Sequence, residues 1–271
     1  MDLGLEGARV VIAGGTKGMG LAAATCFARD GADVAVLARG AAALEETLER
    51  LRELGSPEPL AIPTDLRDDE SVTGAFAAIA DAWGGEVNTL VIAAGPGEVA
   101  RGGVEQLGDD GWVGAFDIGT LATVRCVRAC LPLLRAAEWG RIVVISAHST
   151  KRQTPGLIAY TASKAALTSV AKNLSQSLAP EEILVNTVSP GSFLSPALRG
   201  YLEMLPPERN VDPDDLHDAM RVIEEDFGHP AYIRRAGRPE EIGPVIAFVG
   251  SRANSYMTGA DINVDGGSDF C

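Results

Sequence analysis

Short runs of apolar, mostly β-branched residues alternate with longer stretches in which apolar positions recur at helical spacing. The runs are apolar almost throughout, which is typical of strands buried on both faces of a parallel sheet. They predict seven strands, at Arg9–Ala13, Val34–Ala38, Leu60–Pro63, Thr89–Ala93, Arg141–Ser146, Leu184–Val188 and Asp261–Val264. The longer stretches predict helices at Gly18–Asp30, Ala41–Leu54, Asp68–Trp83, Asp110–Ala137, Leu157–Leu178 and Pro239–Gly250. This alternation indicates a doubly wound α/β fold of the Rossmann type, with a seven-stranded parallel sheet and helices on both faces.

The segment 192–237 interrupts the alternation. It contains no strand-like run, several prolines and many acidic residues, and its helix-like stretch is Asp212–Asp226. A long insertion in a compact domain is usually functional or mobile, so a lid over a binding site is expected here. No repeat, linker or low-complexity tract divides the remainder, and residues 1–271 are therefore expected to form a single dinucleotide-binding domain with a lid insertion.

Composition and charge argue against two classes of binding partner. The 271 residues are 46% hydrophobic and carry a formal net charge of −14 at pH 7. A phosphate-backbone binder needs a basic face, so neither nucleic acid nor an anionic membrane surface is an expected partner. No apolar run approaches the roughly 20 residues of a membrane span, and the N-terminal stretch lacks the features of a signal peptide. A cytoplasmic location is the expectation.

Cysteine usage fits a reducing compartment and provides no metal site. The four cysteines are too sparse for a disulfide-stapled secreted domain. Cys126 and Cys130 are four residues apart in a predicted helix, and no third or fourth ligand lies at useful spacing. The two are interpreted as buried core thiols, and no metal is expected. His217 and His229, in the insertion, are interpreted as structural or solvated.

Glycines cluster directly after the first predicted strand, in Ala13-Gly14-Gly15-Thr16-Lys17-Gly18-Met19-Gly20. Glycine permits a tight turn and close approach of the backbone to a phosphate, and the N-terminus of the following helix supplies free N–H groups and a positive dipole. The same residues could serve a tight turn alone. Their place between a strand and a helix favours the pyrophosphate of a dinucleotide.

The spacing G-x-x-x-G-x-G resembles that of the short-chain dehydrogenase/reductase family, and the resemblance covers essentially the whole chain. Further matches, in the family's order, are Asp65-Leu66, Ala94-Gly95, Tyr160-Thr161-Ala162-Ser163-Lys164, Ser189-Pro190-Gly191, Gly237-Arg238-Pro239-Glu240-Glu241 and Val264-Asp265-Gly266-Gly267. The resemblance implies a nicotinamide-dependent oxidoreductase with a small-molecule substrate. It implies that the cofactor is held by Gly14, Thr16, Lys17, Gly18, Met19, Gly20, Arg39, Asp65, Leu66, Ala94, Gly95, Tyr160, Lys164, Pro190, Gly191, Phe193 and Ser195.

Within that set, the resemblance gives two positions a particular role. Asp65 is expected to meet the adenine. The turn from Pro190 to Ser195 is expected to meet the nicotinamide carboxamide, with the Ser195 hydroxyl in place of the family's usual threonine.

The end of the second predicted strand indicates which nicotinamide cofactor binds. Arg39 follows it, 19 residues beyond Gly20. An acidic residue there would bind a ribose 2′-hydroxyl, whereas a guanidinium pairs with a phosphate. Lys17 adds a second positive charge, and the family uses such a basic pair for NADP. NADP(H) is therefore the expected cofactor, the alternative being two surface cations without a partner.

Tyr160 and Lys164 are the expected catalytic pair. They are four residues apart in a predicted helix and share one face. A phenol of pKa about 10 is a poor acid or base at neutral pH, and a nearby ammonium lowers that pKa. Tyr160 could then exchange a proton with a carbonyl or alcohol oxygen. In the family the lysine also holds the nicotinamide ribose. Alone, such a pair could be solvated surface; the upstream glycine loop favours catalysis.

The usual catalytic serine is replaced. Ala147 stands 13 residues before Tyr160, where the family has a serine that hydrogen-bonds the substrate oxygen. Ser146, Ser149 and His148 are candidates for this role, although alternation along an extended strand end would turn Ser146 to the opposite side. Ser146 is kept with the Tyr-Lys pair as a candidate catalytic residue.

Two further positions lose polar groups. Gly119 stands where the family has an asparagine that links a water to the lysine, and Ile92-Ala93-Ala94-Gly95 replaces Asn-Asn-Ala-Gly. Loss of one oxyanion donor can cost about 10²–10³ in rate. The site could therefore be slow, adapted to a substrate that brings its own polar group, or no longer catalytic.

The insertion and two long helices give expectations about substrate and assembly. Apolar residues could wall a pocket for a bulky apolar substrate or pack the lid on the core, namely Phe193, Leu194, Leu198, Tyr201, Leu202, Met204 and Leu205. Family members form dimers and tetramers through the two long helices. Residues that could pack between subunits, or within one chain, are Ala129, Cys130, Leu133, Leu134, Leu167, Val170 and Leu174.

The sequence therefore predicts an NADP(H)-dependent oxidoreductase that interconverts a carbonyl and an alcohol on an apolar or bulky substrate, as a homodimer or homotetramer. One alternative is a cofactor-binding protein with a decayed site that acts as a regulator or scaffold. Another is reduction of an activated C=C bond on the same cofactor.

Overall fold

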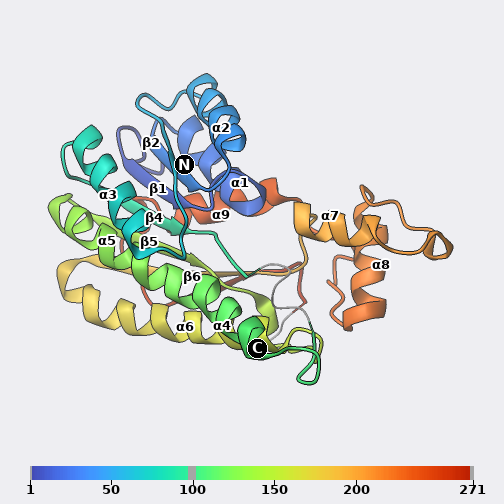
Figure 1. Cartoon of the computed structure of the whole chain (residues 1–271). Coiled ribbons are helices and arrows are strands. Elements are labelled where there is room, and N and C mark those ends of the chain that lie inside the picture. Colours follow the sequence, from blue (N-terminus) through green and yellow to red (C-terminus); the bar gives the residue numbers. More distant parts are fainter. Residues whose placement is uncertain (1, 97–101, 269–271) are drawn as a thin grey trace.

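A seven-stranded parallel sheet in the order β3-β2-β1-β4-β5-β6-β7 forms the centre of the molecule (Figure 1). The computed structural model describes residues 2–96 and 102–268. The strands are β1 (Arg9–Ala13), β2 (Asp33–Ala38), β3 (Leu60–Pro63), β4 (Thr89–Ile92), β5 (Gly140–Ile145), β6 (Ile183–Pro190) and β7 (Asp261–Val264). All seven predicted strands are confirmed. The five inner strands are buried along most of their length, which makes them largely apolar runs that the sequence shows directly, whereas the edge strands β3 and β7 are partly exposed.

Helices cover both faces of the sheet. They are α1 (Gly18–Arg29), α2 (Ala41–Glu53), α3 (Asp69–Trp83), α4 (Asp109–Phe116), α5 (Ala122–Ala136), α6 (Ile158–Leu178) and α9 (Pro239–Val249). Alternate side chains of β1 enter two separate cores. Val10 and Ile12 pack with α1, α2 and α9, whereas Val11 and Ala13 pack with α3, α5 and α6. The three-layer arrangement therefore follows from the pleat of each strand.

The strand order reverses at β1, and this places the ligand crevice. β1 pairs in parallel with β2 on one side and β4 on the other, so that Val11 lies opposite both Ala35 and Leu90. The chain thus runs outward from β1 to β3 and then crosses to β4. In open α/β sheets, ligands bind outside the carboxyl ends of the strands at such a switch point.

One predicted helix is broken. The expected helix from Asp110 to Ala137 is α4 and α5, joined by a π-helical turn at Asp117–Leu121. π-helical turns are frequent at functional sites, and this one contains Gly119. The turn packs against α6, and periodicity along a single segment does not report such a contact.

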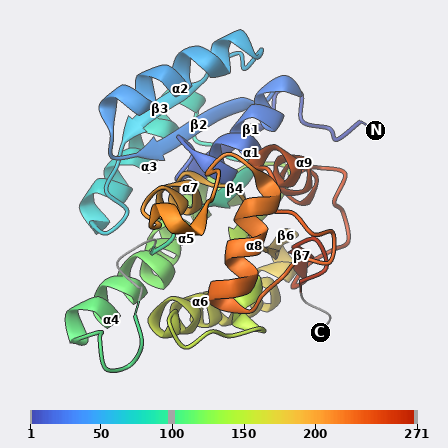
Figure 2. The same ribbon diagram turned by 90° about the vertical axis from the view of Figure 1, so that its right-hand side faces the viewer.

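The insertion holds two helices, α7 (Pro196–Glu203) and α8 (Leu216–Phe227), which lie in front of the carboxyl edge of the sheet (Figure 2). Helix α7 is not predicted from the sequence, and α8 begins four residues later than expected. Its N-cap is Asp215, whose carboxylate accepts the N–H groups of His217 and Asp218. A cap of this kind fixes where a helix begins.

The lid has a small apolar core of its own. Leu202, Leu216, Met220 and Val222 are buried against one another and against neighbouring lid residues. Of the predicted pocket walls, Leu202 belongs to this cluster, Phe193 belongs to the core of the main domain, and Met204 is 68% exposed. The lid thus uses much of its apolar surface for its own folding, and its composition does not identify an apolar substrate.

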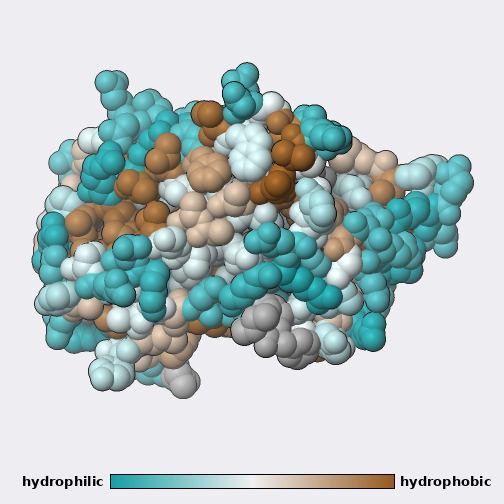
Figure 3. Space-filling model, turned by 90° about the horizontal axis from the view of Figure 1, so that it is seen from below, coloured by the Kyte–Doolittle hydropathy of each residue, from teal (hydrophilic) through white to brown (hydrophobic). Residues whose placement is uncertain are grey.

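The candidate interface residues divide into two groups. Cys130, Leu134 and Leu167 are buried in the core of the chain, so for these three the interpretation as subunit contacts is wrong. Ala129, Leu133 and Leu174 are partly buried, and apolar side chains form patches on the underside of the molecule (Figure 3). Assembly into a dimer or tetramer stays a prediction.

Two other observations concern the described residues alone. Cys126 and Cys130 are buried in the core, as interpreted from the sequence, and burial raises the pKa of the Cys126 thiol to about 12. In residues 2–96 and 102–268, no helix has the length and apolar content needed to cross a bilayer.

Candidate active site

The glycine loop after β1 is shaped for close backbone approach. Gly14 and Gly18 have φ values of +89° and +55°, which side-chain-bearing residues rarely adopt. A Cβ on Gly20 would overlap the carbonyl oxygen of Gly14. A Cβ on Gly14 would lie 3.0 Å from the backbone nitrogen of Ala94. The loop is therefore pressed against the end of β4 at the switch point.

The N-terminus of α1 has the chemistry of an anion site. Its N-cap residue, Lys17, makes no capping hydrogen bond through its side chain, and no acidic residue lies in the first turn. By contrast, Asp68 caps α3 and Ser195 caps α7. Helix N–H groups left without a side-chain cap bind phosphate well. The residues present at this loop therefore fit a dinucleotide pyrophosphate.

Lys17 and Arg39 leave their cationic groups exposed beside this loop. Neither side chain makes a hydrogen bond or an ion pair with any residue in 2–96 or 102–268. Arg39 directly follows β2, which is the neighbour of β1. Asp33, at the opposite end of β2, is buried and accepts the N–H of Glu58 at 2.7 Å. The crevice end of β2 therefore presents positive charge and no carboxylate.

The other predicted cofactor contacts follow β3 and β4. Asp65 is exposed, and its carboxylate accepts the N–H of Arg67 at 3.0 Å. Leu66 is 6% exposed and packs into the core beneath. A Cβ on Gly95 would lie 3.3 Å from the Nζ of Lys164. A continuous line of residues therefore leads from the loop to the expected catalytic pair, through Gly14, Ala94, Gly95 and Lys164.

Tyr160 and Lys164 occupy successive turns near the start of α6. The Lys164 side chain is 3% exposed, and its Nζ donates a hydrogen bond to the carbonyl oxygen of Ile145 at 2.7 Å. Burial lowers the pKa of Lys164 to about 8 and raises the pKa of Tyr160 to about 12. The sequence argument expected the ammonium to lower the tyrosine pKa. The shift is instead upward, and its cause is desolvation by burial, which disfavours the charged phenolate.

The candidate donors beside Ala147 have different surroundings. Ala147 is buried in an extended conformation at the end of β5. Ser146 lies 2.8 Å from the Oγ1 of Thr168 and 3.4 Å from the carbonyl oxygen of Lys164, so its hydroxyl faces α6. Ser149 is 5% exposed in the following 3₁₀ turn. The Nδ1 of His148 lies 3.0 Å from the carbonyl oxygen of Pro190.

Gly119 lies against the helix that carries the catalytic pair. A Cβ on Gly119 would lie 2.6 Å from the Oγ of Ser163 and 3.0 Å from its Cβ. The Ser163 hydroxyl is held by the carbonyl oxygen of Tyr160 at 2.8 Å. An asparagine at position 119 would therefore require a different placement of Ser163.

The turn after β6 is fixed from both sides. A Cβ on Gly191 would lie 2.6 Å from the Cα of Asp265, so this backbone passes close to the chain after β7. Phe193 is buried, and the N–H of Leu194 donates to the carbonyl oxygen of Gly237 at 2.8 Å. The Ser195 hydroxyl accepts the N–H of Leu198 and keeps its own proton for another acceptor.

A set of contacts that the sequence analysis missed fastens the lid to the segment before Tyr160; we call Arg152, Thr154 and His229 the lid anchor. Arg152 donates to the carbonyl oxygen of Gly228 at 3.0 Å, and Thr154 donates to that of Phe227 at 3.2 Å. The Nε2 of His229 lies 2.9 Å from the Thr154 hydroxyl.

The anchor reaches the loop after β5 through two histidines. The rings of His148 and His229 meet edge to face at 5.5 Å between centroids. Burial, and then His148, lower the pKa of His229. No sequence signal marks these residues, because their contacts join segments about 75 residues apart.

Comparison with known proteins is consistent with this geometry. A family model described as enoyl-(acyl carrier protein) reductase matches residues 13–269. The oxidoreductase UcpA of Salmonella typhimurium is 30% identical over 269 residues, covering 97% of this chain and 95% of that protein. The chloroplastic NADPH-dependent aldehyde reductase 1 of Arabidopsis thaliana is 28% identical over 271 residues, with 97% and 87% covered.

A solved structure resembles the whole chain closely. It is L-sorbose reductase from Gluconobacter frateurii, complexed with NADPH and L-sorbose. The TM-score is 0.90 at 28% identity, and the alignment covers 99% of this chain and 98% of the reductase chain. The lid and the sheet therefore both lie within the aligned region.

Proposed function

The chain belongs to the short-chain dehydrogenase/reductase family of oxidoreductases, and from this premise we propose that it uses NADPH to reduce a small-molecule carbonyl to an alcohol. The observation that carries the proposal is the line of close contacts from Gly14 through Ala94 and Gly95 to Lys164. It sets a Tyr-Lys pair on α6 beside a loop built for a dinucleotide.

Backbone and side-chain groups of this chain would bind the cofactor at both of its phosphate positions. The N–H groups at the start of α1 would bind the pyrophosphate, and Gly20 provides the close backbone approach. Lys17 and Arg39 would pair with the 2′-phosphate that distinguishes NADPH from NADH. When bound, the nicotinamide supplies a hydride. The NADPH in the sorbose reductase complex and in the name of the Arabidopsis relative supports this choice.

Tyr160 would supply the proton. With a pKa raised by burial to about 12, the phenol keeps its proton at neutral pH and can donate it to the substrate oxygen. Lys164, with a pKa of about 8, carries an ammonium at the same pH. That positive charge would stabilise the phenolate left behind. In the free protein the phenol is therefore a proton donor at neutral pH.

The substrate oxygen needs a second hydrogen-bond donor, and Ala147 does not provide one. Ser146 was the first candidate from sequence, and its hydroxyl lies with Thr168 and α6. Ser149, buried in the next turn, is the remaining serine on this loop. We propose a substrate that carries its own polar group next to the carbonyl, since such a group can replace part of the lost donor.

A second candidate function is cofactor binding without turnover, in a regulator or scaffold. Ala147 and Gly119 favour it, because each removes a polar side chain from the reacting centre. The retained pair Tyr160 and Lys164 favours the enzyme, since a decayed site has no need of a buried lysine.

The deciding experiment follows NADPH oxidation with a panel of aldehydes, ketones, hydroxyketones and enones, on the wild-type protein and Tyr160→Phe. The proposal expects carbonyl reduction by the wild type and none by the variant, with cofactor binding retained in both. Binding without oxidation across the panel would favour the scaffold. Oxidation with enones alone, giving a saturated ketone, would favour C=C reduction.

A further inference from the structure

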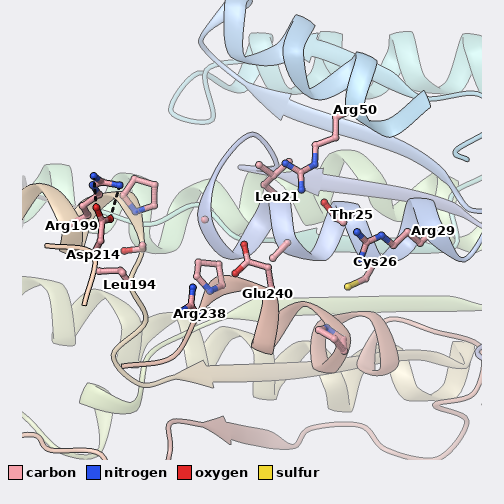
Figure 4. A pocket seen from close by; sticks show the side chains of 16 residues that line it. Leu21, Thr25, Cys26, Arg29, Arg50, Leu194, Arg199, Asp214, Arg238 and Glu240 are labelled. Carbon is pink, nitrogen blue, oxygen red and sulfur yellow. Dashed lines mark hydrogen bonds and ion pairs between the residues drawn. The ribbon is translucent and has the colours of Figure 1, made fainter. Parts of the chain in front are cut away.

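A groove of about 470 Å³ lies over the outer surface of α1 and meets the expected cofactor contacts at one end, at Gly18 and Ser195 (Figure 4). Its floor is the seam where α1 packs against α9, and its ends are formed by α2 and by the start of the lid at Leu194, Pro196 and Arg199. Neither Tyr160 nor Lys164 lines it. A volume of this size is within the range of small-molecule sites.

The floor of the groove is fixed by close helix packing. A Cβ on Gly243 of α9 would lie 2.8 Å from the carbonyl oxygen of Ala22 of α1. Leu21, Ala22, Pro239 and Pro244 supply apolar walls along the seam. The floor of the groove is therefore formed by two closely packed helices of the main domain, whereas one end belongs to the lid.

The groove is positive in a strongly acidic protein. Four arginines and two carboxylates line it, whereas the whole chain carries a net charge of −14. Arg199 is paired with Asp214 at 2.8 Å, and Glu240 lies at the start of α9. Arg29 and Arg50 make no ion pair with any residue in 2–96 or 102–268. Two unpaired guanidinium groups in one groove attract an anion.

Thr25 adds an independent observation. It is 7% exposed and lines the groove, and its Oγ1 is a buried oxygen without a hydrogen-bond partner among the described residues. Buried hydroxyls in folded proteins are almost always paired. Figure 4 shows the guanidinium groups of Arg29 and Arg50 directed toward Thr25 from α1 and α2. A ligand group at this point would satisfy the hydroxyl as well as the two cations.

We propose that the groove is a binding site for a small phosphate ester, with the phosphate on Arg29, Arg50 and Thr25 and its apolar body along Leu21 and Pro239. The donors approach from two helices in different directions. A tetrahedral phosphate has oxygens for several directions, whereas a planar carboxylate is matched by a single guanidinium fork.

Cys26 provides a direct probe of occupancy. Its thiol lines the groove and is partly exposed, and burial raises its pKa, so that its alkylation is slow and measurable. The experiment titrates phenyl phosphate and measures the rate of Cys26 modification by a maleimide, by mass spectrometry of the Cys26 peptide. Because Arg29 also lowers the thiol pKa, the midpoint of protection is compared between variants, not the basal rate.

The expected result is saturable protection in the wild type and a midpoint at least about tenfold higher in Arg29→Gln/Arg50→Gln. Arg52→Gln, on the same helix as Arg50 and outside the groove, is the matched control and is expected to keep the wild-type midpoint. Thr25→Val is expected to weaken protection less than the arginine pair. Phenol, the same body without phosphate, is expected to protect poorly.

Three outcomes would overturn the proposal. One is no protection by phenyl phosphate; another is equal protection by phenol, which would make the groove merely apolar. The third is loss of protection in Lys17→Gln/Arg39→Gln, which would place the phosphate at the cofactor loop. Protection that survives in that double variant supports the groove whether or not the protein binds NADPH.

Discussion

A Cβ atom on Gly119 would lie 2.6 Å from the Oγ of Ser163, so the π-helical turn and α6 fit together without a side chain at position 119. Ser163 is the residue directly before Lys164, and its hydroxyl is held by the carbonyl oxygen of Tyr160 at 2.8 Å. The packing of α6 against this turn therefore leaves no room for the asparagine side chain. Gly119 and Ser163 fit each other as they stand.

Restoring a side chain at position 119 is expected to disturb this contact. Gly119→Ala should lower the free energy of unfolding by about 1–3 kcal/mol, as overpacking of a buried site does. A double-mutant cycle with Ser163→Gly should show a coupling of about 0.5 kcal/mol or more, since the second change makes room for the methyl group. Additive effects in denaturant unfolding would show that the two positions do not press on each other.

Adding the lost hydroxyl tests how the pocket is built. Ala147→Ser is expected to preserve or raise the reduction of simple ketones, by up to about 10²-fold if the hydroxyl reaches the substrate oxygen. The measurement is kcat/KM for a simple ketone against a hydroxyketone. Ala147→Val, which adds bulk without a donor, is the control. A clear loss of activity in Ala147→Ser would mean that the pocket is built around alanine.

The lysine pKa of about 8 predicts how reduction depends on pH. Above that pH Lys164 loses the proton whose charge would stabilise the phenolate, so kcat/KM for reduction is expected to fall about tenfold per pH unit. A profile that stays flat to pH 10 would contradict this role for Lys164.

The same pKa predicts a stability effect with a defined sign. Burial lowers the lysine pKa from 10.5 to about 8, so between these values the unfolded chain binds more protons than the folded one. The stability of the wild type relative to Lys164→Met is therefore expected to rise with pH across that window, by up to about 3 kcal/mol in total. Loss of the hydrogen bond to Ile145 in Lys164→Met shifts the stability difference by a constant amount and does not alter its change with pH. A difference independent of pH would contradict the buried-ammonium account.

The lid anchor predicts a local change in dynamics. Arg152→Ala removes donors to Gly228 and Ser268, so amide hydrogen exchange at 227–229 is expected to be about tenfold faster or more. Glu224→Gln, which breaks an exposed lid ion pair of 3.8 Å with Arg234, should change exchange there little. Equal effects of the two variants would mean that Arg152 is not an anchor.

The sequence predicted the sheet well because the inner strands are buried on both faces and show up as apolar runs. It also located the glycine loop and the pair Lys17 and Arg39, since these follow directly from their positions after β1 and β2. It did not predict α7, whose apolar residues pack within the lid. It also did not predict the π-helical turn, which lies against Ser163 of α6, a contact between segments far apart in the sequence.

The pKa shifts of the catalytic pair could not be predicted without the structure. Helical spacing placed Tyr160 and Lys164 on one face, but the direction of the tyrosine pKa shift depends on burial. The lid anchor likewise joins Arg152 and Thr154 to residues about 75 positions away. Local patterns along the chain contain no information about such pairings.

The most direct test of the central claim is an equilibrium fluorescence titration of the wild-type protein with NADPH and, separately, with NADH. The account predicts saturable binding that favours NADPH, and loss of most of that preference in Lys17→Gln/Arg39→Gln, since the two cations would pair with the 2′-phosphate. Binding that is equal for both or favours NADH would contradict the role of Arg39 while leaving the fold intact. Binding of neither nicotinamide would contradict the account of the protein as an NADPH-dependent reductase.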